Sequence, residues 1–110
     1  MEGEDILITV IHKKPDQGPE VVQIETMEEI EALIEDEFDA AYDDYLDGIV
    51  FLISESARGI KANNFTMKTD GFYDWVYGPC VVAKLQENRI VSLNEQEMKS
   101  VMDYFISRKG

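Results

Sequence analysis

Short apolar runs divide the chain into strand-like segments separated by turn residues. Residues 6–12, 20–25 and 49–53 are rich in Ile, Val and Leu, which is typical of strands. The first and third runs lack clear polar–apolar alternation, which predicts burial on both faces. Residues 75–85 and 89–93 also read as extended, with Gly78-Pro79 as a bend. Residues 60–65 fit either a short strand or an extended loop.

Two further segments show the three- and four-residue spacing of amphipathic helices. Thr26 and Glu29 have the spacing of a capping box, so a helix should begin just after Thr26. Asn94 is a second N-cap signal, and Leu93 can pack on Met98 one turn in. The apolar stripes of the two helices are Met27, Ile30, Leu33, Ile34 and Phe38, and then Met98, Val101, Met102 and Phe105. Arg108 and Lys109 should end the second helix.

The order of these elements is strand, strand, helix, several strands, helix. It predicts one small α+β domain over residues 1–110, with a largely antiparallel sheet and two amphipathic helices. A chain of 110 residues is long enough for a single core. Residues 39–47 fit either a loop or an extension of the first helix.

Negative charge is concentrated in one part of the sequence. Eleven of the 23 acidic residues lie between Glu25 and Asp47, where there is no Lys or Arg, and they supply most of the net charge of −13. This segregation favours a partner with a basic surface. It disfavours direct nucleic-acid binding, because that affinity comes largely from Lys and Arg. The acidic start of the chain and the lack of a long apolar run favour a cytoplasmic protein without a membrane contact.

Candidate chemistry is sparse. Cys80 is the only cysteine and has apolar neighbours, so we expect a buried residue and no disulfide. His12 is the only histidine, which excludes a multi-histidine zinc site, and it reads as an edge or loop residue. No nucleophile elbow and no phosphate-binding glycine loop is present. We therefore expect neither an enzyme nor a cofactor.

A calcium loop is the one metal site that the acidic segment suggests. Asp43, Asp47 and Gly48 match three positions of an EF-hand loop. However, Tyr45 stands at the third position of such a loop, and Ser54 stands at the twelfth, where a bidentate Glu is required. We therefore predict no metal site.

Aromatic residues stand beside acidic ones in two places. Tyr42 and Tyr45 lie within the acidic segment, and Phe72, Tyr73, Trp75 and Tyr77 surround Asp70 and Asp74. Rings beside carboxylates are common at interaction surfaces. The polar neighbours of Tyr42 and Tyr45 favour exposure, whereas Phe72 and Trp75 fit the core and an interface equally well.

Three stretches resemble a family of small uncharacterised domains carried mainly by bacteriophages, prophages and mobile elements. They are IVFLISESARGIKANN at 49–64, DWVYGPCVVA at 74–83 and VSLNEQEM at 91–98. The strand, Pro-rich turn, strand and helix of the first 34 residues are also similar, whereas Asn94 at the cap and the long acidic segment depart from the pattern. The resemblance implies no activity. It does imply an accessory protein that acts on a host component.

The sequence thus favours a non-enzymatic protein that binds and inhibits or modulates a host protein, such as a nucleic-acid-handling or anti-phage defence protein. The expected contact residues are Glu28, Glu31, Glu35, Asp36, Glu37, Asp39, Tyr42, Asp43, Asp44, Tyr45 and Asp47. Those from Asp39 onward lie outside the helix stripe and carry the hypothesis most directly. Two alternatives stay open. Arg58, Lys61, Asn63, Asn64 and Lys68 could line a small-molecule or nucleotide pocket, or the acids could be a merely solvated face of an assembly protein.

Overall fold

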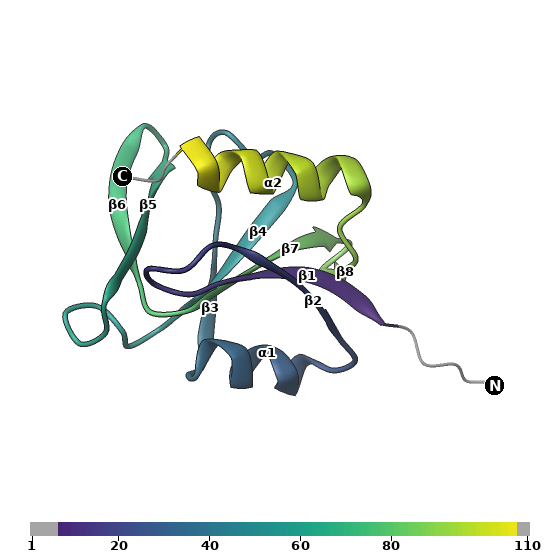
Figure 1. The fold of residues 1–110 in the computed structure, drawn as a ribbon, viewed down its shortest axis with the longest axis horizontal. Helices are drawn as coiled ribbons and strands as arrows, with labels where there is room; N and C mark the ends of the chain where they lie inside the picture. Colours follow the sequence, from purple (N-terminus) through teal and green to yellow (C-terminus); the bar gives the residue numbers. More distant parts are fainter. Residues whose placement is uncertain (1–6, 108–110) are drawn as a thin grey trace.

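The computed structural model describes residues 7–107, and Figure 1 shows a sheet with a helix on either side. The α+β class and the largely antiparallel pairing are confirmed. The elements in chain order are β1 (Ile8–Lys13), β2 (Glu20–Ile24), α1 (Met27–Ile34), β3 (Phe38–Ala41), β4 (Ile49–Ser54), β5 (Asn63–Thr69), β6 (Phe72–Tyr77), β7 (Cys80–Gln86), β8 (Arg89–Val91) and α2 (Glu95–Ser107). Ile6, Arg108 and Lys109, which the sequence placed in the first strand and at the end of the last helix, lie outside the described residues.

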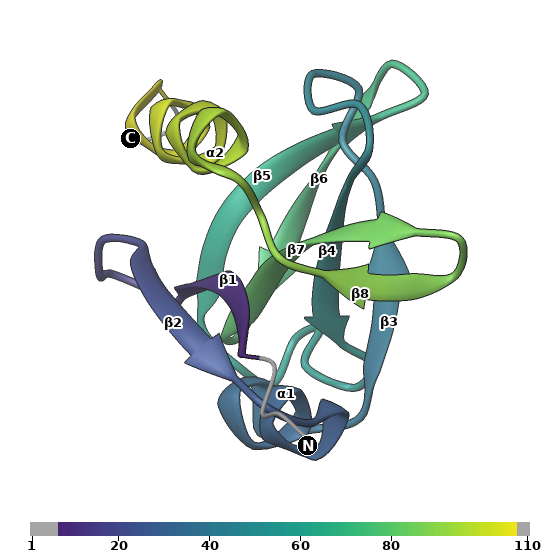
Figure 2. The same cartoon turned by 90° about the vertical axis from the view of Figure 1, so that its right-hand side faces the viewer.

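The main sheet has the strand order β2-β1-β7-β4-β3, and β8 pairs with the second half of β7. All of its pairs are antiparallel (Figure 2). The strands β1, β7 and β4 lie inside the sheet, and both of their faces are covered. This explains why their sequences are apolar without alternation. β5 and β6 form a separate two-stranded hairpin.

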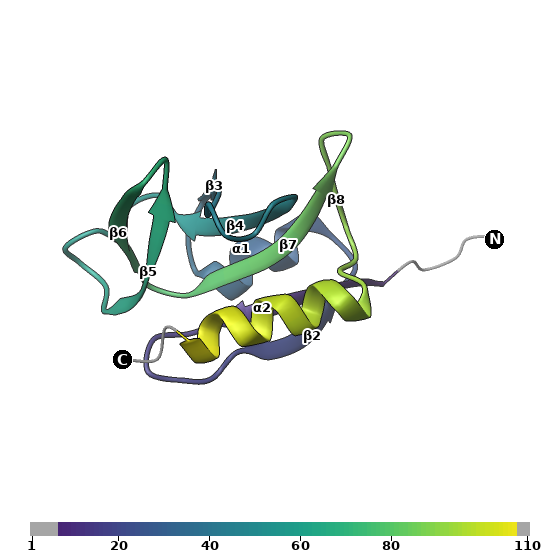
Figure 3. The same cartoon turned by 90° about the horizontal axis from the view of Figure 1, so that it is seen from above.

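Each face of the sheet has its own apolar cluster. On one face, Ile30 and Ile34 of α1 pack against a set that includes Val50 and Val81. On the other, Phe51 and Val82 belong to a cluster with side chains of α2 and of the β5–β6 hairpin. Figures 1 and 3 show α1 and α2 on opposite sides of the sheet. The β5–β6 hairpin therefore lies on the α2 side.

Both helices begin where their caps predict. The Glu29 carboxylate accepts a hydrogen bond from the backbone N–H of Thr26 at 3.0 Å. At the start of α2, Asn94 and Glu97 form two hydrogen bonds with each other, both of 2.8 Å. Asn94 Oδ1 accepts from the N–H of Glu97, and Glu97 Oε1 accepts from the N–H of Asn94. These are short-range interactions, so the sequence alone could locate them.

The end of α1 was predicted wrongly. The helix stops at Ile34, and Glu35 adopts a left-handed conformation with φ of 67°. Phe38, which continued the helical stripe in the sequence, instead begins β3 opposite Ser54. Asp39 is likewise a strand residue, so residues 39–47 are neither a single loop nor a helix extension. Phe38 still packs in the cluster beneath α1, which is why its spacing matched the stripe.

Residues 75–85 are two strands of different sheets. Gly78 separates β6 from β7 with φ of +77°, and a Cβ atom there would lie 2.9 Å from Cδ of Lys61. The backbone conformation and this close approach both favour glycine. The hairpin β5–β6 therefore folds away from the main sheet at this position.

Candidate partner-binding surface

Asp43, predicted to contact a partner, lies inside the fold. Its side chain is only 4% exposed. Its Oδ2 atom accepts hydrogen bonds from the hydroxyl of Tyr104 at 2.6 Å and from the backbone N–H of Lys68 at 2.9 Å. Its Oδ1 atom accepts from the N–H of Tyr45 at 2.8 Å. Asp43 therefore joins the acidic segment to the hairpin and to α2, and the expectation that it contacts a partner is corrected.

Asp44 binds the tip of the same hairpin. The turn residues Asp70 and Gly71 both have positive φ, 51° and 85°, as in the tight turns that suit two-residue hairpins. Their N–H groups donate to the two carboxylate oxygens of Asp44, each at 2.9 Å. Asp44 also donates its own N–H to the Lys68 carbonyl oxygen at 2.7 Å. Its carboxylate is exposed, but it is already engaged within the domain.

Asp36 has a similar internal role at the other end of β3. One of its oxygens accepts from the hydroxyls of Ser54 and Ser56 at 2.5 and 2.6 Å. These hydroxyls, together with backbone N–H donors, hold the pKa of Asp36 well below its usual range. The carboxylate thus links the α1–β3 connection to the end of β4.

The other predicted acids do not form one continuous face. Glu28 and Glu31 are exposed on α1, on the opposite side of the sheet from the hairpin. Glu37 and Asp39 lie at β3 near the exposed residue Glu55. The pKa of Glu55 is raised first by the negative charge of Asp39, and then by some loss of hydration and by the charges of Glu37 and Asp36. Glu35 ends α1, and Asp47 lies in the turn before β4. The acids predicted to contact a partner are therefore divided between separate parts of the domain.

Several exposed rings lie on the acidic segment and on β6 of the hairpin. Tyr42, Tyr45, Phe72, Tyr73 and Trp75 are between 45% and 78% exposed. The ammonium group of Lys68 lies 5.5 Å from the ring centres of both Tyr45 and Tyr73, so the two segments meet through a cation–π pair. Phe72 and Trp75 are therefore not core residues, and their place in an interface stays a prediction. We call these five aromatic residues and Lys68 the hairpin surface.

A groove continues this surface toward α2. It has a volume of about 530 Å³ and is lined by Tyr45, Leu46, Ser100, Asp103, Tyr104 and Ser107. Tyr45 belongs to both the groove and the hairpin surface. The groove therefore extends the aromatic area and adds one exposed carboxylate, that of Asp103, to it.

The residues proposed for a small-molecule pocket each have contacts within the domain. Arg58 pairs with Asp74 at 2.5 Å and lies over Tyr77, whereas Lys61 donates to the Glu35 carbonyl oxygen at 3.3 Å. Asn64 donates to the carbonyl oxygens of Lys13 and Gly78, each at 2.8 Å. Asn63 begins β5 opposite Tyr77, and Lys68 lies near the other end of that strand. These contacts engage Arg58, Lys61 and Asn64 within the domain, and the small-molecule alternative stays a prediction.

The two residues singled out for reactivity are both buried. His12 lies inside the sheet and donates from Nε2 to the Leu33 carbonyl oxygen at 3.0 Å, so its assignment to an edge or loop is corrected. Cys80 is fully buried, as predicted, and burial raises the pKa of its thiol.

Among residues 7–107 there is no group of His, Cys, Asp and Glu placed to hold a metal ion. No described helix is long and apolar enough to cross a bilayer.

The chain belongs to the family of the domain of unknown function DUF3846, whose family model matches residues 8–106. The match runs from the start of β1 almost to the end of α2, and so includes the hairpin surface. This confirms the expectation of an uncharacterised domain family. Comparisons with curated proteins and with solved structures found no match.

Proposed function

We propose that this DUF3846 domain is a non-enzymatic module that binds a protein with a basic surface through its hairpin surface. The observation that carries the proposal is the exposure of five aromatic side chains on two segments that Lys68 and buried Asp43 hold together. Single exposed apolar residues are common on any protein. Several exposed aromatic residues on two adjoining segments are typical of an interaction site.

Aromatic residues suit this role for a physical reason. Each ring buries a large area while fixing only two side-chain torsions, so the entropic cost of immobilising it is low. The hydrogen bonds of Asp43 and Asp44 already order the segment that carries Tyr42 and Tyr45. A surface ordered before binding loses less entropy when the complex forms.

Charge supports a basic partner. The chain carries −13 at neutral pH, and Asp47, Asp70, Asp74 and Asp103 are all exposed residues of the loops and elements that form the hairpin surface and its groove. A surface of this kind attracts a cationic partner and repels nucleic acid. Exposed Glu28 and Glu31 add to the overall field from the far side of the sheet, but they are not expected to touch the partner.

The resemblance to domains carried by bacteriophages and other mobile elements suggests which partner to seek. It supports a host protein in the cytoplasm, and an effect that inhibits or modulates that protein. A protein that normally handles nucleic acid would offer the required basic groove.

Affinity capture from host lysate tests the proposed function. Wild type is compared with a variant carrying Tyr45→Ser, Tyr73→Ser and Trp75→Ser, and with a control carrying Glu28→Gln and Glu31→Gln. We expect wild type and the control to retain the same basic protein at low salt and to lose most of it at high salt. The aromatic variant should not retain it. Retention by the aromatic variant, or loss in the control alone, would contradict the proposal.

A further inference from the structure

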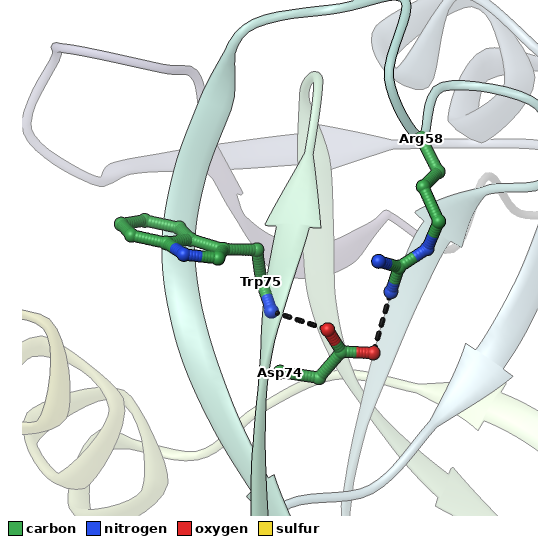
Figure 4. A network of polar contacts seen from close by, with 3 residues as sticks. All are labelled: Arg58, Asp74 and Trp75. Carbon is green, nitrogen blue, oxygen red and sulfur yellow. Dashed lines mark hydrogen bonds and ion pairs between the residues drawn. The ribbon is translucent and has the colours of Figure 1, made fainter.

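The strand β6 has an edge that no strand pairs with among residues 7–107. Figure 4 shows the backbone N–H of Trp75 directed away from β5, where it donates to Oδ1 of Asp74 at 2.8 Å. Residues two apart in a strand present their backbone groups to the same edge. The backbone groups of Tyr73 therefore face the same unpaired edge as those of Trp75.

The edge is covered by side chains that can move aside. The second carboxylate oxygen of Asp74 accepts from Arg58 at 2.5 Å, and these side chains are 66% and 63% exposed (Figure 4). Ion pairs exposed to this degree contribute little to stability. An incoming strand could replace the Asp74 carboxylate at the Trp75 N–H without leaving a donor unpaired.

We propose that this edge of β6 receives an extended segment of the protein partner as an added strand. The proposal rests on the proposed function and names how the partner is held. Backbone hydrogen bonds to Tyr73 and Trp75 supply affinity, and alternate side chains of the segment supply specificity. The exposed ring of Trp75 lies on one face of the hairpin, whereas Asp74 points to the other (Figure 4). Tyr73 shares the face of Trp75, because the two residues are two apart in β6.

This alternation defines the chemistry of the segment. Apolar side chains of the added strand pack beside Tyr73 and Trp75, and Lys or Arg side chains alternate with them on the Asp74 face. A second copy of this chain is disfavoured as the occupant, because two chains of charge −13 repel each other.

The other free edges are less suitable. β3 and β2 end the main sheet, but they have only four and five residues, and β8 has three. The outer edge of β5 is already engaged, because the backbone N–H and C=O groups of Lys68 bind Asp43 and Asp44. β6 has six residues, and three of them are exposed aromatics. A long, exposed and aromatic edge strand is the type that pairs with another chain.

A synthetic peptide of alternating Val and Lys residues tests the proposal on the wild-type domain. Trp75 is the only tryptophan, so its fluorescence reports on the β6 edge directly. We expect the peptide to shift the Trp75 emission to shorter wavelength. The same peptide with every backbone amide N-methylated cannot donate backbone hydrogen bonds. Its affinity for the domain should therefore be lower by a factor of about ten at least. Equal binding of the two peptides, or no shift of Trp75, would overturn strand addition.

A matched pair of variants tests the protein side. Tyr73→Ala and Tyr73→Pro both remove the ring, but only Tyr73→Pro removes the outward N–H, and proline is tolerated at such edge positions. The proline variant should bind the peptide several-fold more weakly than the alanine variant, with circular dichroism confirming that both fold. If the two bind alike, the added strand is excluded. If the proline variant does not fold, the N-methylated peptide still decides.

Two further results separate this inference from the proposed function. Loss of lysate capture in the aromatic variant, together with equal binding of the two peptides to wild type, would retain the proposed function and reject strand addition. Sedimentation of the wild-type domain should show a monomer. A dimer that Tyr73→Pro dissociates would assign the edge to a second copy and overturn the basic segment as its occupant.

Discussion

Replacing Asp43 with Asn should destabilise the domain far more than its position in a charged surface segment suggests. The carboxylate accepts from three donors: the Tyr104 hydroxyl and the backbone N–H groups of Lys68 and Tyr45. An Asn side chain has one acceptor oxygen and one NH₂ group. In either orientation its NH₂ group faces at least one backbone N–H, and that donor loses its partner.

The expected cost follows from the donors affected. One part-buried donor without a partner costs about 1–3 kcal/mol, and the other bonds lose the strength that the negative charge gave them. We therefore expect the free energy of unfolding to fall by about 2–4 kcal/mol, a large part of the roughly 5–15 kcal/mol of a typical domain. Tyr104→Phe removes one bond to a charged group and should cost about 1.5–3 kcal/mol.

Urea unfolding followed by far-ultraviolet circular dichroism measures these changes. Asp47→Asn is the matched control, because Asp47 is exposed in the same segment and should change the free energy by less than about 0.5 kcal/mol. In the double variant, the effects of Asp43→Asn and Tyr104→Phe should not add, since both act on one hydrogen-bond network. The structural role given to Asp43 would be refuted if Asp43→Asn were as harmless as Asp47→Asn.

Three other changes test the fold and its charges. Glu55→Gln should raise the midpoint of thermal unfolding. The pKa of Glu55 is raised chiefly by repulsion from Asp39, and a neutral side chain removes that repulsion. An unchanged midpoint would contradict this explanation. Burial lowers the pKa of His12 below its ordinary value of 6.5, so the free energy of unfolding should be constant above about pH 6.5 and fall as the pH drops below it. His12→Gln should flatten that decline, as urea unfolding at several pH values would show. Phe51→Ala, in the cluster under α2, should cost about 3–5 kcal/mol, and a loss below about 1 kcal/mol would be inconsistent with its complete burial.

The sequence located the features that depend on near neighbours. The starts of both helices were predictable, because each cap involves groups three residues apart. The buried strands β1 and β4 were predictable from their apolar composition. The Asp70-Gly71 pair was a further local signal, since such pairs favour two-residue hairpin turns. It could have revealed the β5–β6 hairpin, which places Phe72, Tyr73 and Trp75 in the candidate site.

The roles of the acidic residues depended on tertiary structure. Asp43 and Asp44 look alike in the sequence and adjoin each other. Yet Asp43 is buried against Tyr104, and Asp44 binds a turn that is 26 residues away along the chain. Phe38 matched a helical stripe but joined a strand, because pairing with β4 and packing beneath α1 outweighed its spacing. Charge and periodicity are properties of the sequence. Whether a carboxylate faces solvent or satisfies buried donors depends on the distant segments that the fold brings beside it.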